Sequence, residues 1–92
     1  MSRTAPALAS IDALSAALRG GAHGGPGDQL REELDALRRA AAAFHMEAIR
    51  FRMHSVDRLL KGSPNEDLQR LFDQVRTELE AAGFHTRSHA AP

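Results

Sequence analysis

The feature that most constrains this chain is a run of 34 residues, from Asp28 to Lys61, that contains no Gly and no Pro. The run is rich in Ala, Leu, Glu and Arg, which all have high helix propensity. At a rise of 1.5 Å per residue it predicts one helix about 50 Å long. A kink near Ala40–Ala43 is open, but no helix-breaking residue demands it. Five Gly and one Pro at 20–27 precede it as a predicted flexible linker, and Gly62 follows it. We therefore predict an all-α protein built around this helix.

Shorter helices are predicted on both sides of the run. Before it, Ser10 is a suitable N-cap for a helix that ends near Arg19, so residues 1–9 are expected to be loose. After it, the sequence SPNE at 63–66 combines a capping Ser, a Pro at the first helical position and a Glu three residues after the cap. This third helix is predicted to reach about Ala82.

The end of the third helix and its connection to the long one are also predictable. Gly83 should end the helix, and Phe84 should fold back onto Leu79 in a Schellman motif. A connection of only about two residues predicts that the two helices form an antiparallel hairpin. The predicted organisation is a flexible segment over 1–27 with a short helix at about 10–19 and a Gly-rich linker, a helical hairpin domain over 28–84, and a disordered tail over 85–92.

The long predicted helix carries more apolar surface than one partner helix can cover. At about 100° per residue, seven apolar side chains from Leu30 to Phe51 form one stripe, and a second stripe, which begins at Met46, lies about 120° round. The third helix has only one narrow stripe to offer. Surplus apolar surface usually marks an interface. The predicted interface residues are Phe44, Ala48, Ile49, Phe51, Met53, Val56 and Leu60.

Two arrangements would cover this surface, one between chains and one within a single chain. A second copy of the chain or another helical protein could cover it, so that the chain completes a helical bundle by self-association, most simply as a dimer. The alternative is that the short N-terminal helix swings in on the Gly-rich linker and completes the core within a monomer. We predict the intermolecular arrangement.

Two polar residues interrupt the apolar surface. His45 and Arg52 are seven residues apart, so they share one face of the predicted helix, between the two stripes. A buried Arg needs a partner, so an acid from another helix or chain should face it. The pair would then be a polar or ligand anchor. In the other interpretation, Arg52 extends to the edge of the surface and His45 makes a routine hydrogen bond.

A second function class is a small metal- or ligand-binding helical bundle that uses His and Met side chains at a dimer groove. His45 and His54 are the candidate metal ligands. Nine residues separate them, which places them on opposite sides of one helix, so only two chains together could bring them to one ion. Three positions after Glu47 the residue is Arg50 and not His, so the Glu-x-x-His pair of di-iron bundles is missing.

The composition argues against several other classes. Twelve basic and 12 acidic residues balance, so the positive excess of a nucleic-acid-binding protein is missing. The chain has no Cys, which excludes thiolate catalysis and fits a reducing compartment. No apolar run approaches the roughly 18 residues of a membrane span, and the first residues do not form a signal peptide. We predict a non-catalytic cytoplasmic module for oligomerisation or protein–protein interaction, with no cofactor and no nucleic-acid or membrane partner.

Overall fold

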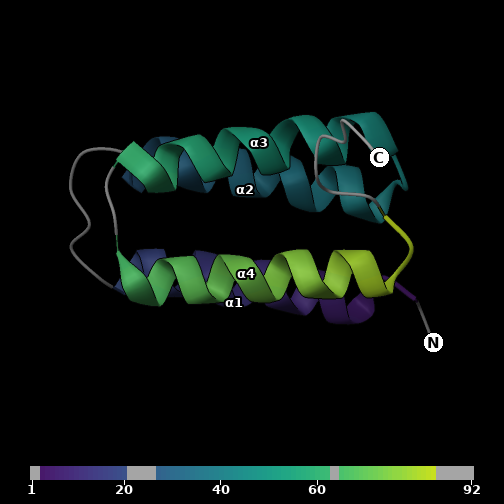
Figure 1. Cartoon of the computed structure of the whole chain (residues 1–92), viewed down its shortest axis with the longest axis horizontal. Coiled ribbons are helices and arrows are strands. Elements are labelled where there is room, and N and C mark those ends of the chain that lie inside the picture. The colour runs from purple at the N-terminus through teal and green to yellow at the C-terminus, as the bar shows by residue number, and fades with distance from the viewer. Residues whose placement is uncertain (1–2, 21–26, 63–64, 85–92) are drawn as a thin grey trace, which may run out of the picture.

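The computed structural model describes residues 3–20, 27–62 and 65–84, and within these ranges it contains four α-helices and no strand. The helices are α1 (Ala5–Gly20), α2 (Gly27–Ala42), α3 (Met46–Gly62) and α4 (Glu66–Ala81). Successive helices run in opposite directions and lie in two pairs, α2 with α3 and α1 with α4 (Figure 1). The predicted all-α helical bundle is therefore confirmed for this part of the chain.

The single helix predicted over 28–61 is wrong, because the chain reverses at Phe44, whose φ of 59° is left-handed. The amide of His45 donates a hydrogen bond to the carbonyl of Ala40 at 3.0 Å. The amide of Phe44 donates to the carbonyl of Ala41 at 3.2 Å. This pair of bonds is the Schellman motif that ends a helix. As a result α2 lies beside α3 instead of continuing into it.

The first helix is longer than predicted, since it begins at Ala5 and not at Ser10. Ala7 extends the apolar stripe of Ile11 and Leu14 one turn toward the N-terminus, and all three are fully buried. A Pro in the first turn of α1 is tolerated because the amides there have no partner within the helix. This longer helix packs chiefly on α4 and also on α2, whereas α3 packs chiefly on α2.

One hydrophobic core is shared by all four helices. Its side chains lie at helical spacing on the inner face of each helix, and each large one stabilises the fold by roughly 1.5–3 kcal/mol. The largest fully buried side chains are those of Phe72, Ile11, Leu14, Leu34, Leu37, Ile49, Met53, Leu79, Val56 and Val75. The two apolar stripes predicted on one long helix are therefore the inner faces of two separate helices.

The N-terminus of α4 is capped by Asn65 and not by Ser63 as predicted. The backbone of Asn65 is extended, and its side-chain oxygen accepts a hydrogen bond from the amide of Leu68 at 3.1 Å. Asn is among the most favourable N-caps because its oxygen satisfies a helix amide. Ser63 and Pro64, like most of the predicted Gly-rich linker and the predicted tail over 85–92, lie outside the described residues.

The C-terminus of α4 has the predicted Schellman motif. The amide of Phe84 donates to the carbonyl of Leu79 at 2.9 Å, and the amide of Gly83 donates to the carbonyl of Glu80 at 3.0 Å. Gly83 has φ 100°, which a residue without Cβ adopts readily. The ring of Phe84 is buried and lies 5.9 Å, between centroids, from the ring of Phe44. The C-terminal ends of α2 and α4 therefore meet.

Candidate protein-binding site on the third helix

Four of the seven predicted interface residues belong to the core of the monomer. Ile49, Met53, Val56 and Leu60 are at most 3% exposed. The expectation that they await a second chain is wrong, because the reversal after α2 and the longer α1 supply their cover within one chain. Ala48 is half-buried and packs against the same core.

The remaining two, Phe44 and Phe51, are the two large hydrophobic side chains that stay exposed in the described part of the chain, at 59% and 60%. Phe44 lies in the turn between α2 and α3 and contacts Phe84. Phe51 lies on α3 about 200° round from the buried Ile49, so it points away from the core. The first apolar stripe ends with α2, and Phe51 is consequently left on the outside of the bundle.

Arg52 connects Phe51 to the neighbouring helix. Nη1 of Arg52 donates to both carboxylate oxygens of Glu33 on α2, at 3.0 and 3.1 Å. The guanidinium carbon of Arg52 lies 5.1 Å from the centroid of the Phe51 ring, a cation–π distance. The acid expected to face Arg52 is therefore Glu33, from another helix of the same chain. His45 takes no part in this pairing, since it lies exposed in the turn before α3.

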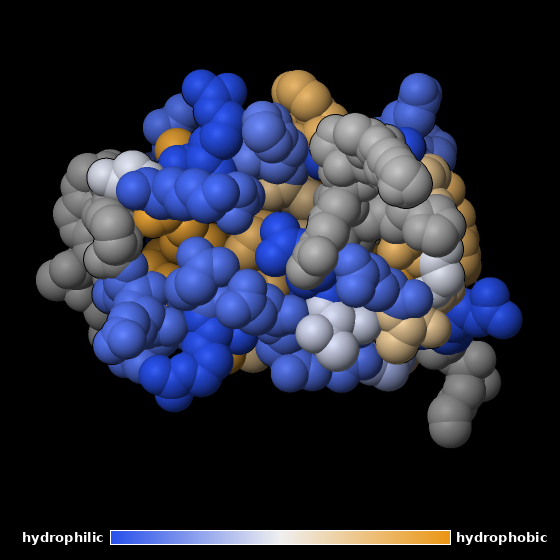
Figure 2. All heavy atoms as spheres, viewed as in Figure 1, coloured by the Kyte–Doolittle hydropathy of each residue, from blue (hydrophilic) through white to orange (hydrophobic). Residues whose placement is uncertain are grey.

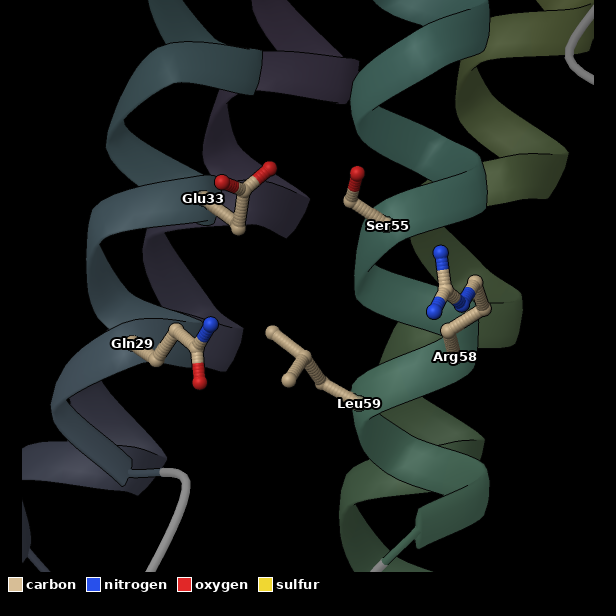
Figure 3. A pocket seen from close by; sticks show the side chains of 5 residues that line it. All are labelled: Gln29, Glu33, Ser55, Arg58 and Leu59. Carbon is tan, nitrogen blue, oxygen red and sulfur yellow. The ribbon is translucent and has the colours of Figure 1, made fainter.

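A pocket of about 250 Å³ lies between α2 and α3 on this side of the bundle. Its lining residues are Gln29 and Glu33 from α2, and Ser55, Arg58 and Leu59 from α3. Figure 3 shows the side chains of Gln29, Glu33 and Leu59 extending into the space between the two helices. The amide of Gln29, the hydroxyl of Ser55 and the guanidinium of Arg58 supply hydrogen-bond donors. The pocket therefore offers donors and one apolar side chain in a small volume.

The exposed side chains of α3 form a basic surface, which we name the α3 outer face. Its members are Glu47, Arg50, Phe51, His54, Arg58 and Lys61. Lys61 pairs with Asp57 of the same helix at 3.0 Å. No carboxylate in the described ranges forms an ion pair with Arg50 or Arg58. Hydrophilic side chains cover most of α3 and α4, and apolar ones show in the seam between these helices, at the upper edge of the molecule and at its right-hand end (Figure 2).

A larger hollow of about 550 Å³ lies between α1 and α2, and four of its seven charged lining residues pair with one another. Arg38 donates to both carboxylate oxygens of Asp12, from Nε at 2.7 Å and from Nη2 at 3.1 Å. Arg31 likewise pairs with Asp28 at 2.7 Å. The hydrogen bond from Arg38 holds the pKa of Asp12 below its ordinary value. We interpret this hollow as an ion-paired seam between two helices.

The candidate metal ligands are not gathered at one place. His45 is exposed in a turn, and His54 is exposed on the α3 outer face. Met53 is only 1% exposed, so it faces the core and not a groove between chains. Among the residues described, no three His, Cys, Asp or Glu side chains are close enough to hold a metal ion.

Comparison with known proteins does not assign the chain to a class. Protein-family models, curated proteins and solved structures were compared with it, and none matches. No helix in the described ranges combines the length and apolar character needed to cross a membrane. The function must therefore be inferred from what the α3 outer face and the adjoining pocket can bind.

Sequence reasoning identified Phe51 and Arg52 as site residues but missed all five residues that line the pocket, Arg58 included. The α2 residues Gln29 and Glu33 approach the α3 residues of the pocket only because α3 turns back along α2. On one continuous helix, Glu33 and Arg52 would lie 19 residues apart, or about 28 Å. The available signal was the change of phase between the two apolar stripes, which a break in the helix explains.

Proposed function

We propose that this protein is a non-catalytic interaction module, a four-helix bundle that binds a partner protein through the α3 outer face and the adjoining pocket. The observation that carries the proposal is the exposed ring of Phe51, which is held against Arg52. Aromatic residues and Arg most often dominate the binding energy of protein interfaces. A ring that already contacts a neighbouring side chain also loses less conformational freedom on binding.

The fold changes which partner we favour. We predicted self-association because one chain was expected to leave its core incomplete. The described helices instead complete the core within one chain. A symmetric dimer through this site would bring two copies of the same surface together. Each copy of the α3 outer face has three basic residues and one acidic residue, so the two surfaces would repel each other. We therefore propose a different protein as the partner.

Site-specific photo-crosslinking tests the proposal. A photo-reactive phenylalanine derivative replaces His54, which is exposed near Phe51, or Thr77, which is exposed on α4, in cells that express the chain. We expect a discrete adduct from position 54 and none from position 77. Phe51→Asp should abolish the adduct with unchanged helicity, whereas the matched variant Thr77→Asp should retain it. Adducts that form equally at both positions, or that persist in Phe51→Asp, would contradict the proposal.

The mass in solution provides a second test. Size-exclusion chromatography with light scattering, at two protein concentrations, should give the mass of a monomer for the wild-type chain and for Phe51→Asp. A stable dimer that Phe51→Asp converts to monomer would instead show that the α3 outer face binds a second copy. A dimer that is insensitive to Phe51→Asp would place the interface on another surface.

A further inference from the structure

The pocket between α2 and α3 is lined by one cationic group, that of Arg58, which forms no ion pair with any residue that the structure describes. Of its two charged lining residues, Glu33 is already bound by Arg52 at 3.0 Å. Arg58 has no ion-pair partner in the described ranges. With the charge of Glu33 compensated, the pocket is effectively positive and favours an anionic group.

The size of the pocket indicates what kind of anion it takes. Pockets for drug-sized small molecules have volumes of about 300–1,000 Å³. At about 250 Å³, this pocket lies below that range, and it is open to the protein surface. A single carboxylate side chain fits such a volume better than a whole metabolite. Arg58 matches a carboxylate well, because a guanidinium donates two parallel hydrogen bonds to its oxygens.

The positions along α3 indicate that a helix carries this carboxylate. Phe51, Ser55 and Arg58 occupy positions i, i+4 and i+7, so they form one stripe about 10 Å long. An amphipathic helix that binds along another helix uses the same i, i+4, i+7 spacing for its anchor residues. An apolar residue on Phe51 and an acidic residue at Arg58 would then be two turns apart on the partner.

The charges of the two neighbouring helices also select an acidic partner. α3 contains four basic and two acidic residues, whereas α4 contains two basic and five acidic residues. An acidic helix is attracted to α3 and repelled by α4, which favours a position over α3 and away from α4. An anionic membrane surface is less suitable, because it is broad enough to meet α4 together with α3.

We infer that the partner segment is an acidic amphipathic helix that lies along α3, covers Phe51 with its apolar stripe and places one carboxylate in the α2–α3 pocket against Arg58. This inference rests on the proposed function and specifies its partner. Electrostatic complementarity of this kind raises the association rate and makes binding weaken with salt.

Fluorescence anisotropy with the full chain and two labelled helical peptides tests the inference. Both peptides carry Leu at i, i+4 and i+7, with Glu on the flanks of one and Lys at the same positions of the other. We expect the acidic peptide to bind and the basic one not to. Arg58→Glu should weaken the acidic peptide roughly tenfold, a change of about 1.4 kcal/mol. The matched variant Arg70→Glu on α4 should leave its Kd unchanged, while Phe51→Asp should abolish binding.

Some outcomes would contradict only the acidic-helix inference, and others would also contradict the proposed interaction function. If the acidic peptide does not bind, or binds Arg58→Glu as well as wild type, the acidic-helix inference fails. Sedimentation with phosphatidylcholine–phosphatidylserine vesicles that depends on Phe51 and Arg58, without peptide binding, would identify a lipid surface instead. If the His54 adduct with a protein persists while the peptide fails, the interaction function stands with a partner of other chemistry. Loss of that adduct as well would overturn both.

Discussion

The C-terminal ends of α2 and α4 have the same pair of backbone hydrogen bonds but different residues at the left-handed position. At the end of α4 this residue is Gly83, with φ 100°, and at the end of α2 it is Phe44, with φ 59°. A left-handed conformation costs a residue with Cβ roughly 1–2 kcal/mol, which Gly avoids. The end of α4 therefore follows from local preference, whereas the end of α2 is imposed by its surroundings.

What imposes it is the packing on both sides of the turn. Reversal at Phe44 lets the inner faces of α2 and α3 join one core, and it places the ring of Phe44 against Phe84. The same reversal brings Glu33 to Arg52, and so it builds the candidate binding site. Strained residues of this kind are found where the surrounding structure outweighs the local cost. The candidate binding site therefore depends on the strained turn at Phe44.

The largest expected effect is on the free energy of unfolding, and it should differ between Phe84 and Phe44, whose rings are in contact. Phe84→Ala should lower the free energy of unfolding by about 3–5 kcal/mol, because its ring is only 6% exposed. Phe44→Ala should lower it by no more than about 1.5 kcal/mol, since mainly the ring contact with Phe84 is lost. Urea denaturation followed by circular dichroism measures both. Equal losses would show that Phe44 is a core residue after all.

A smaller effect is expected from Gly83→Ala. A Cβ at Gly83 has room, because the nearest side-chain atom, Nη1 of Arg3, would be 4.0 Å away. The loss should therefore be the cost of the left-handed backbone alone, about 1–2 kcal/mol. It is read from the midpoint of denaturation at constant m-value. A neutral substitution would mean that the end of α4 readily changes its backbone conformation.

The difference in stability between a Gly and an Ala substitution should have opposite signs at the two exposed Phe residues. Phe44→Gly should be more stable than Phe44→Ala by about 1 kcal/mol, because Gly relieves the left-handed strain. At Phe51, in the interior of α3, Gly should be less stable than Ala by about 0.5–1 kcal/mol. Thermal unfolding of the four variants decides the matter. The same order at both positions would mean that Phe44 is not strained.

The smallest expected effect on stability concerns the ion pair between Asp12 and Arg38, which lies away from both helix ends. Asp12→Asn removes the ion pair with Arg38 and should lower Tm slightly at pH 7. Because the pKa of Asp12 is held below its ordinary 3.8, the stabilisation is complete above that pH and is lost as the pH falls through the lower value. The Tm difference between variant and wild type should accordingly shrink at pH 2–3. The change should add to that of Phe44→Gly, since the sites share no partner.

The sequence predicts the helices better than their ends. Helix propensity and apolar periodicity correctly indicated helical structure over most of α2, α3 and α4, and Gly83 correctly marked the end of α4. The end of α2 was missed because no Gly or Pro marks it, and a Phe in the left-handed position is uncommon for steric reasons. Ala5 to Ala9 were missed because small apolar residues give a weak periodic signal, although Ala7 is fully buried.

The candidate site was predicted only where it depends on a single helix. The exposure of Phe51 follows from the position at which α2 ends, and the partner of Arg52 follows from the reversal, so neither could be fixed before the break was known. The change of phase between the apolar stripes was interpreted as a second face of one helix. It is better explained by two helices that each need one inner face.

The pairing of α1 with α4 places the first and the last helix of the bundle side by side. A ribosome synthesises α1 first, and the helix that covers much of its apolar stripe emerges last. Until α4 is complete, Ile11, Leu14 and Leu18 can be covered only in part, by α2. Nascent chains and fragments that end before Glu66 therefore present an apolar surface on which aggregation and chaperone binding act. The bundle therefore closes late in its own synthesis, and α4 determines whether it closes at all.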